Sequence, residues 1–150
     1  MGAGLLRRPF LLPRLFAPLD LHDPPWLTCP LGHPLAESGL FLRTGELARF
    51  AQLLVREGRW NGRQVLPARY VRRMAGERVD TSAVTCGEPY THGDGLGVWI
   101  DRADTYRLDG RYGRYVVVSP ARRAAVTVTA HAERDQELLA AIHELVVARL

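Results

Sequence analysis

The first clear hydrophobic pattern along the chain has the period of an α-helix. Its apolar positions recur three, four and seven residues apart and would bury one stripe of the helix: Leu47, Phe50, Ala51 and Leu54. Thr44 is suited to cap this helix, and Glu46 in the first turn complements the positive end of the helix dipole. Gly58 is expected to end it in a left-handed conformation. We therefore predict a helix that begins at Gly45 or Glu46 and ends before Gly58.

A turn and a second helix follow this first helix. The pair Asn61-Gly62 is typical of a tight hairpin turn. Pro67 is well placed as the first residue of the second helix, which would run to Gly76. Residues 77–93 show no period and are predicted to form a loop.

From Gly95 onward the pattern becomes that of β-strands. Short apolar runs separated by turn signals cover residues 96–100, 106–108, 112–118 and 124–130. Segment 119–123 is the clearest hairpin turn. Alternation in the last two runs indicates that one face of the sheet is more buried than the other. A final amphipathic helix after Asp135 would bury its stripe on this sheet, formed by Leu138, Leu139, Ile142, Leu145 and Val146.

The N-terminal residues 1–36 contain seven prolines and scattered bulky apolar groups. Such a stretch is expected to be extended chain and turns, with at most one short helix near residues 11–16. We therefore predict a single domain of the α+β class over residues 1–150. Its parts are a Pro-rich extended segment (1–36), a segment with two helices (37–92), and an antiparallel meander of three or four strands with a C-terminal helix packed on it (93–150).

The composition excludes several kinds of catalytic motif. All 20 basic residues are arginine, and the chain contains no lysine. A phosphate-binding P-loop, a Schiff-base lysine and a Ser–Lys catalytic pair are therefore impossible within these residues. Serine occurs only at Ser38, Ser82 and Ser119.

The net charge of +4 permits an acidic partner, but the arginines are scattered along the sequence. Solvated surface arginines are therefore favoured over a nucleic-acid-binding face. No apolar run approaches the roughly 20 residues of a transmembrane helix, and prolines interrupt any signal-like core near the N-terminus. We expect neither a nucleic-acid nor a membrane partner, and no targeting signal points away from the cytoplasm as the default compartment.

Two Cys–His pairs raise the question of a metal site. Cys29 precedes His33 with three residues between them, and Cys86 precedes His92 with five. Structural zinc ligands usually lie on tight knuckles with two to four residues between two cysteines, and neither pair has that form. We therefore interpret all four as ordinary loop residues and expect neither a metal nor another cofactor.

Five further patterns occur in order along nearly the whole chain. They are LFAPLDL (15–21), GLFLRTGELARF (39–50), NGRQVLP (61–67), GDGLGVW (93–99) and DGRYGRYVVVSP (109–120). The first four are similar to the LFxPLGM, GGLxxTxxDLARF, NGKQLLP and YGYGLGxW segments of the serine β-lactamase-like family. The fifth resembles the strand that carries that family's third active-site motif. The family includes class C β-lactamases, esterases and D-alanyl-D-alanine peptidases, and the shared order of the segments, rather than any single one, carries the resemblance.

The resemblance implies acyl transfer through a serine nucleophile. In the family, Ser-x-x-Lys supplies the nucleophile and its base, and Tyr-x-Asn or Ser-x-Asn adds a second proton-transfer group. Neither motif is present here, because lysine is absent and the only asparagine, Asn61, follows Arg59 at that spacing. In the family both motifs precede the LFxPLGM segment. The chain therefore resembles the C-terminal portion of such a hydrolase without its nucleophile.

The third motif of the family, Lys-Thr-Gly or a variant of it, has a counterpart in Leu108-Asp109-Gly110. Gly110 fits a position where substrate approaches the strand backbone closely. The resemblance implies that the next backbone N–H, that of Arg111, forms half of an oxyanion hole. Leu108 replaces a cation and Asp109 a hydroxyl, which favours an esterase-like or peptidase-like relative. An alternative is that Asp109 is a plain turn residue.

Three functions follow from these observations. The favoured one is the C-terminal part of a serine hydrolase, inactive alone, whose complete protein acts on a small ester, amide or peptide-like substrate. The second is a non-catalytic domain of the same fold, degenerate or partner-binding, and the least favoured is a basic nucleic-acid-binding module. We also expect self-association, because residues 1–36 are a poor cover for the sheet face that the C-terminal helix leaves free.

Overall fold

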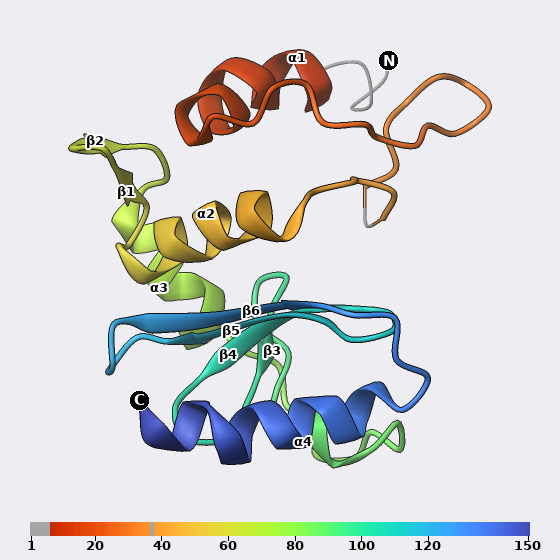
Figure 1. Ribbon diagram of the computed structural model, residues 1–150, viewed down its shortest axis with the longest axis vertical. Helices are drawn as coiled ribbons and strands as arrows, with labels where there is room; N and C mark the ends of the chain where they lie inside the picture. Colours follow the sequence, from red (N-terminus) through yellow and green to blue (C-terminus); the bar gives the residue numbers. More distant parts are fainter. Residues whose placement is uncertain (1–6, 37) are drawn as a thin grey trace.

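The computed structural model describes residues 7–36 and 38–150, which are arranged in four layers (Figure 1). The N-terminal segment forms the outermost layer, and helices α2 and α3 lie between it and a four-stranded sheet. Helix α4 covers the other face of the sheet. The described part of the chain is thus α+β with an antiparallel meander, as predicted. No helix in it combines the length and the apolar character needed to cross a bilayer.

The N-terminal segment is more helical than its prolines indicated. It contains helix α1 (Arg7–Leu11), a π-helical turn η1 (Leu12–Phe16) and a 3-10 turn η2 (Ala17–Leu19). The prediction of extended chain with at most one short helix is wrong for these residues. Pro13 and Pro18 both stand in the first turn of a helical element, where a missing N–H costs little. From η2 to Arg43 the described residues form turns and irregular chain, with isolated bridges such as Trp26 to Leu40.

Helix α2 (Thr44–Val55) begins where the sequence placed it, within one residue. Arg43, not Thr44, is the residue that precedes the helix, and its N–H donates a 2.7 Å hydrogen bond to Glu46 Oε2. The Thr44 hydroxyl instead contacts the hydroxyl of Thr129 on the sheet. Glu46 therefore satisfies an N-terminal backbone donor, while Thr44 links the helix to the sheet.

Helix α2 is buried on two sides rather than along one stripe. Leu53 packs against Phe16 and Leu19 of the N-terminal segment, and Ala51 and Leu54 pack toward the sheet. The Pro-rich segment therefore covers α2 and not the sheet itself.

The end of α2 depends on a glycine. Gly58 has φ +83°, and a Cβ at this position would lie 2.2 Å from the backbone oxygen of Leu66. Strands β1 (Arg59–Trp60) and β2 (Arg63–Gln64) follow, joined by the predicted Asn61-Gly62 turn.

Both residues of this turn have positive φ, as a tight hairpin turn requires. Helix α3 (Ala68–Gly76) comes next, with Pro67 just before its first residue. The loop that follows contains one 3-10 turn, η3 (Glu88–Tyr90).

The sheet has the order β3-β4-β5-β6, which is also the chain order. Its strands are β3 (Trp99–Ile100), β4 (Tyr106–Gly110), β5 (Arg114–Ser119) and β6 (Ala124–Thr129). Strand β3 is shorter than predicted because residues 96–98 belong to the preceding loop, where the Leu96 N–H donates to the Met74 carbonyl. Residues 112 and 113, predicted to be in a strand, form the turn between β4 and β5.

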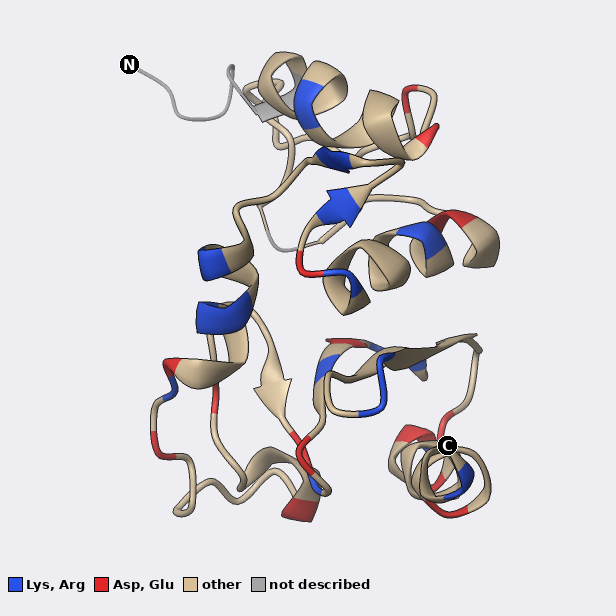
Figure 2. Ribbon diagram, turned by 90° about the vertical axis from the view of Figure 1, so that its left-hand side faces the viewer, with Lys and Arg blue, Asp and Glu red and all other residues tan. Residues whose placement is uncertain are grey.

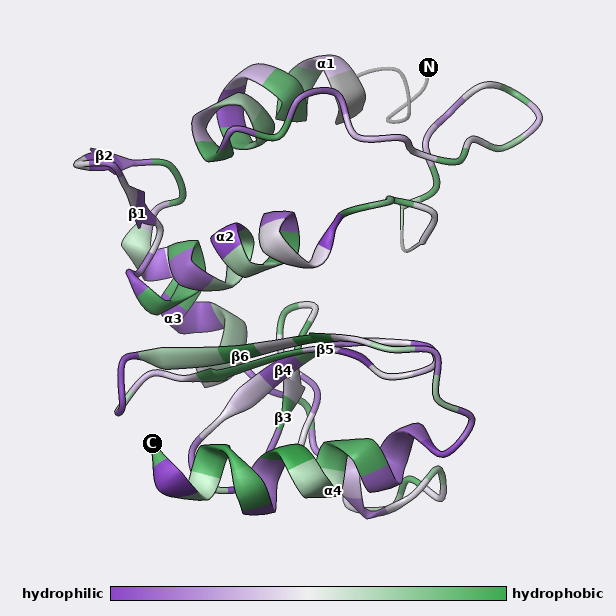
Figure 3. Cartoon of the chain, viewed as in Figure 1, coloured by the Kyte–Doolittle hydropathy of each residue, from purple (hydrophilic) through white to green (hydrophobic). Residues whose placement is uncertain are grey.

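Both faces of β5 are buried, which corrects the expectation of one more-buried face. Val116 and Val118 pack beneath α2 and α3, whereas Tyr115 and Val117 pack against α4. Apolar positions accordingly dominate β5 and β6 and alternate with polar ones on α4 (Figure 3).

Helix α4 (Asp135–Leu145) buries Leu139 and Ile142 of the predicted stripe but not all of its members. Leu145 and Val146 are exposed, and His143 and Val147 are buried in their place. The cause is the end of the α-helix at Leu145, after which the chain tightens into the 3-10 turn η4 (Val147–Arg149).

Candidate functional site

The residues that the sequence assigned to the third motif lie at the end of β4. Leu108, Asp109 and Gly110 are its last residues and pair with Val116, Tyr115 and Arg114 of β5. Arg111 opens the turn between the two strands. Asp109 is therefore a strand residue, so the alternative of a plain turn residue is wrong.

All four predicted site residues line one cavity of about 670 Å3. Its other walls come from the N-terminal segment and α2 and are largely apolar, including Leu15, Phe16, Leu19, Leu21, Trp26, Leu47 and Phe50. Folding thus brings the LFAPLDL segment and the DGRYGR segment, far apart in the sequence, to the same hollow. A cavity of this size and lining accommodates apolar groups.

Two backbone features define the strand end that faces this cavity. A Cβ on Gly110 would lie 3.0 Å from the Cβ of Arg114, so the β5 neighbour already crowds this position. Among the turn and loop hydrogen bonds of the described residues, none has the Arg111 N–H as its donor.

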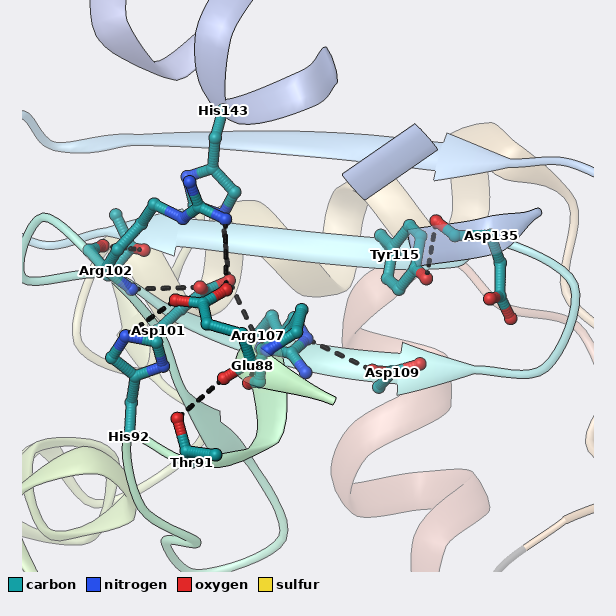
Figure 4. A network of polar contacts seen from close by, with 12 residues as sticks. Glu88, Thr91, His92, Asp101, Arg102, Arg107, Asp109, Tyr115, Asp135 and His143 are labelled. Carbon is teal, nitrogen blue, oxygen red and sulfur yellow. Dashed lines mark hydrogen bonds and ion pairs between the residues drawn. The ribbon is translucent and has the colours of Figure 1, made fainter. Parts of the chain in front are cut away.

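A buried ion network lies on the α4 face of the same strand, and the sequence analysis did not anticipate it (Figure 4). Its centre is Arg107, whose side chain is 0% exposed. Arg107 Nη1 donates to the carbonyl of Pro89 at 2.9 Å and lies 3.3 Å from Asp101 Oδ2. Arg107 Nε donates to Asp109 Oδ2 at 3.1 Å. The guanidinium also stacks over the ring of Tyr90, 5.0 Å from the ring centroid. Its remaining nitrogen, Arg107 Nη2, is buried and has no hydrogen-bond partner.

Asp101 joins this arginine to helix α4. Its Oδ2 lies 2.8 Å from Nε2 of His143, and its Oδ1 accepts a 2.9 Å hydrogen bond from the N–H of Arg102. Burial opposes ionisation of Asp101. The hydrogen bonds from His143 and Arg102, together with the Arg107 charge, outweigh burial and hold the Asp101 pKa below its ordinary value.

Asp109 has the opposite balance. Burial raises the pKa of Asp109, and the hydrogen bond and positive charge of Arg107 only partly offset that effect. The two carboxylates thus share one arginine but differ in the direction of their pKa shift.

The network is positioned to hold structure rather than to perform chemistry. It ties together β4, the loop after β3, the η3 turn and α4, and its central side chains are closed to solvent. Arg107 is the residue before Leu108, the first residue of the predicted site. The network therefore holds the end of β4 in place, and with it the predicted site residues that follow Arg107. The sequence contained two signals of this network. One is the charged residue Arg107 within a predicted strand, and the other is His143 on the predicted apolar face of the C-terminal helix.

The four candidate zinc ligands do not form a site in the structure. Cys29 and His33 are joined only by a backbone hydrogen bond between the Cys29 N–H and the His33 carbonyl, and Cys86 is exposed. His92 instead lies 3.2 Å from Glu88. Across residues 7–36 and 38–150, no group of three or more side chains is arranged to hold a metal ion.

The fold can be compared with known proteins. A Bacillus anthracis protein described as a 6-aminohexanoate-dimer hydrolase superimposes with a TM-score of 0.60 at 20% sequence identity. A Bacteroides dorei protein described as a β-lactamase superimposes with a TM-score of 0.60 at 19% identity. This chain has a β-lactamase-like fold. No protein-family model matches the sequence, and no curated protein matches it significantly.

The β-lactamase-like fold is only partly represented here. The superpositions cover 83% and 84% of this chain but 33% and 43% of the two solved structures. The chain therefore spans well under half the length of these structural relatives.

Proposed function

We propose that the chain is the C-terminal part of a serine hydrolase of the β-lactamase-like family, inactive by itself. The observation that carries the proposal is the meeting of Leu108–Arg111 with the LFAPLDL segment at one apolar cavity, within a β-lactamase-like fold. The partial coverage of both structural relatives supports a role as part of a larger catalytic unit.

In this proposal β4 forms one edge of the active site. The N–H of Arg111 donates to the oxyanion that develops when a serine attacks the substrate carbonyl. Gly110 has no side chain, so the substrate can approach the strand backbone closely. The apolar cavity binds the acyl group of a small ester, amide or peptide-like substrate. The nucleophile and its lysine come from outside these 150 residues, because the chain has no lysine.

A non-catalytic domain of the same fold is the second candidate. The ion pair between Arg107 and Asp109 favours it, because the carboxylate of Asp109, the middle residue of the third-motif counterpart, is engaged in a structural contact.

Labelling with a serine-directed fluorophosphonate tests the proposal. The 150-residue chain should take up no label and turn over no ester or β-lactam probe, since Ser38, Ser82 and Ser119 have no lysine partner. In-frame Ser-x-x-Lys and Tyr-x-Asn motifs upstream of Met1 in the DNA would support the hydrolase. Labelling at any of the three serines would refute it, and an upstream frame without these motifs would favour the non-catalytic domain.

Self-association of the isolated chain stays a prediction, although the reason drawn from the sequence is wrong. Helices α2 and α3 cover the sheet face that was expected to be open. The apolar surface that could still drive association is the wall of the cavity beside β4. Sedimentation velocity measures the oligomeric state, and fluorescence of a hydrophobic dye reports exposed apolar surface. We expect oligomers or dye-binding monomers, and a compact monomer that binds no dye would contradict the prediction.

A further inference from the structure

Four arginines that are scattered in the sequence gather around a second hollow, of about 990 Å3. We call it the arginine groove and define it by Arg56, Arg59, Arg72 and Arg123. Arg56 follows α2, Arg59 lies on β1, Arg72 on α3, and Arg123 in the turn between β5 and β6. These elements meet at one end of the molecule (Figure 1), and Figure 2 marks the basic positions along the ribbon. No described residue lines both this groove and the cavity beside β4.

The positive charge of the arginine groove is largely uncompensated. The only acidic side chain in its lining is Glu57, which forms an ion pair with Arg72 at 2.7 Å. In the described part of the chain, Arg56, Arg59 and Arg123 have no acidic partner within salt-bridge distance, and the Arg56 guanidinium lies 5.9 Å from the Trp60 ring centroid. Like charges around one concave surface focus the electrostatic potential and attract anions.

The floor of the groove is apolar. It is formed by side chains beneath the arginines, among them Leu54, Val71, Ala75 and Tyr106. Burial raises the pKa of Tyr106 to about 12, so this residue adds no negative charge at neutral pH. The groove therefore combines a neutral, mostly hydrocarbon base with a cationic rim.

We propose that the arginine groove binds a small organic phosphate with an apolar body. A phosphate monoester carries about −1.5 to −2 charges near pH 7 and has three acceptor oxygens, which suits a hollow lined by several arginines. Guanidinium groups bind such oxygens through paired hydrogen bonds. The apolar part of the ligand lies on the floor. A long nucleic-acid backbone fits less well, because its footprint is a stripe of basic residues rather than a cluster around one hollow.

Octyl phosphate is the probe, used with the complete 150-residue chain in isothermal titration calorimetry. We expect one molecule to bind per chain, with an affinity that falls as salt rises. Inorganic phosphate lacks the apolar body and 1-octanol lacks the charge, so each should bind at least about tenfold more weakly.

Matched variants separate the arginine groove from general surface charge. Arg59→Gln and Arg123→Asn should each weaken octyl phosphate binding about tenfold, the usual effect of losing a charged hydrogen bond. Asparagine suits position 123, where φ is +52°. Their controls are Arg63→Gln on the same hairpin as Arg59 and Arg122→Asn beside Arg123, neither of which lines the groove. Both controls should bind within about twofold of the parent chain.

Three results would overturn the proposal. The first is equal binding of octyl phosphate and 1-octanol, which would show that charge plays no part. The second is an equal loss in the control variants, which would show a general charge effect. The third is a loss in Arg111→Gln with none in Arg59→Gln, which would place the ligand in the cavity beside β4. None of these results bears on the hydrolase proposal, because its labelling experiment uses no phosphate ligand.

Discussion

The two faces of the four-stranded sheet bury different kinds of interior. Beneath α2 and α3 the buried side chains are apolar, with Val116, Val118 and Leu54 at the centre. Beneath α4, Leu139 and Ile142 pack beside a network of ionisable groups centred on Arg107. The same strand, β4, therefore contributes an apolar contact on one side and an ion cluster on the other.

The two faces should respond differently to substitution. Apolar burial is non-directional, so the α2 face should lose stability in proportion to the volume removed. The ion network is directional, and removal of one partner leaves another charge buried without compensation. The α4 face should therefore be more sensitive to a single substitution than the α2 face.

The largest effect is expected from Arg107→Met. This change leaves the carboxylates of Asp101 and Asp109 without their shared cation, and should lower the free energy of unfolding by about 3–5 kcal/mol. Urea denaturation measures it. Arg114→Met, at the exposed first residue of β5, is the control and should stay within about 0.5 kcal/mol. If Arg107→Met does not fold, Arg107→Lys, which keeps the charge but loses the planar fork, gives the same direction with a smaller loss.

The apolar face gives the next largest effect. Leu54→Ala should cost about 3 kcal/mol, because it leaves a cavity between α2 and the sheet where Leu54 is 2% exposed. Its effect should add to that of Arg107→Lys within about 0.5 kcal/mol, since the two residues lie on opposite faces of the sheet. Strong non-additivity would show that the two interiors act as one.

The two carboxylates of the network should respond differently to pH. The pKa of Asp101 lies below its ordinary 3.8, so its ionised form contributes stability above pH 3.8 that is lost as pH falls through the lower folded-state pKa. The pKa of Asp109 is raised, so its ionised form is unfavourable at neutral pH, and protonation relieves that cost as pH falls.

Amide substitutions at these two positions provide the measurement. At pH 7, Asp101→Asn should cost about 2–3 kcal/mol, and Asp109→Asn about 1 kcal/mol or less. The deficit of Asp101→Asn should shrink below about pH 4, as the parent chain loses the same carboxylate. Urea curves at pH 7 and pH 3.5 decide this, and equal losses for the two variants at pH 7 would contradict the assigned pKa directions.

Local signals predicted the frame of the fold well. The spacing of apolar residues and the end signals placed the start of α2 within one or two residues. Asn61-Gly62 located the hairpin of β1 and β2, and the turn at 119–123 located the hairpin of β5 and β6. Each of these features depends on residues close together in the sequence. The third-motif position is also local, and the structure puts its four residues on one cavity wall.

The features that sequence analysis missed have causes outside any local window. Asp109 lies two residues from Arg107 on the same strand, but the other partners come from positions 89 and 101, and His143 is reached only through Asp101. No periodicity links these more distant residues to Arg107. The helical N-terminal segment was missed because proline stops a helix in its interior but suits its first turn, and composition does not distinguish the two. The arginine groove was missed for the same reason as the network, since only folding brings its four residues together.

We propose that the end of β4 supplies an oxyanion donor, and replacement of that donor tests this role. In a protein that joins this chain to the proposed upstream segment with the Ser-x-x-Lys motif, Arg111→Pro removes the backbone N–H, while Arg111→Ala keeps it. Arg111 is not among the residues with positive φ, and Gly110 before it lies in a strand, so proline fits without a forced turn. Thermal melting checks that both variants fold. We expect Arg111→Pro to lower kcat for an ester substrate about 10²–10³-fold and Arg111→Ala to stay near the parent rate. Full activity in the folded Arg111→Pro variant, or equal losses in both variants, would contradict it.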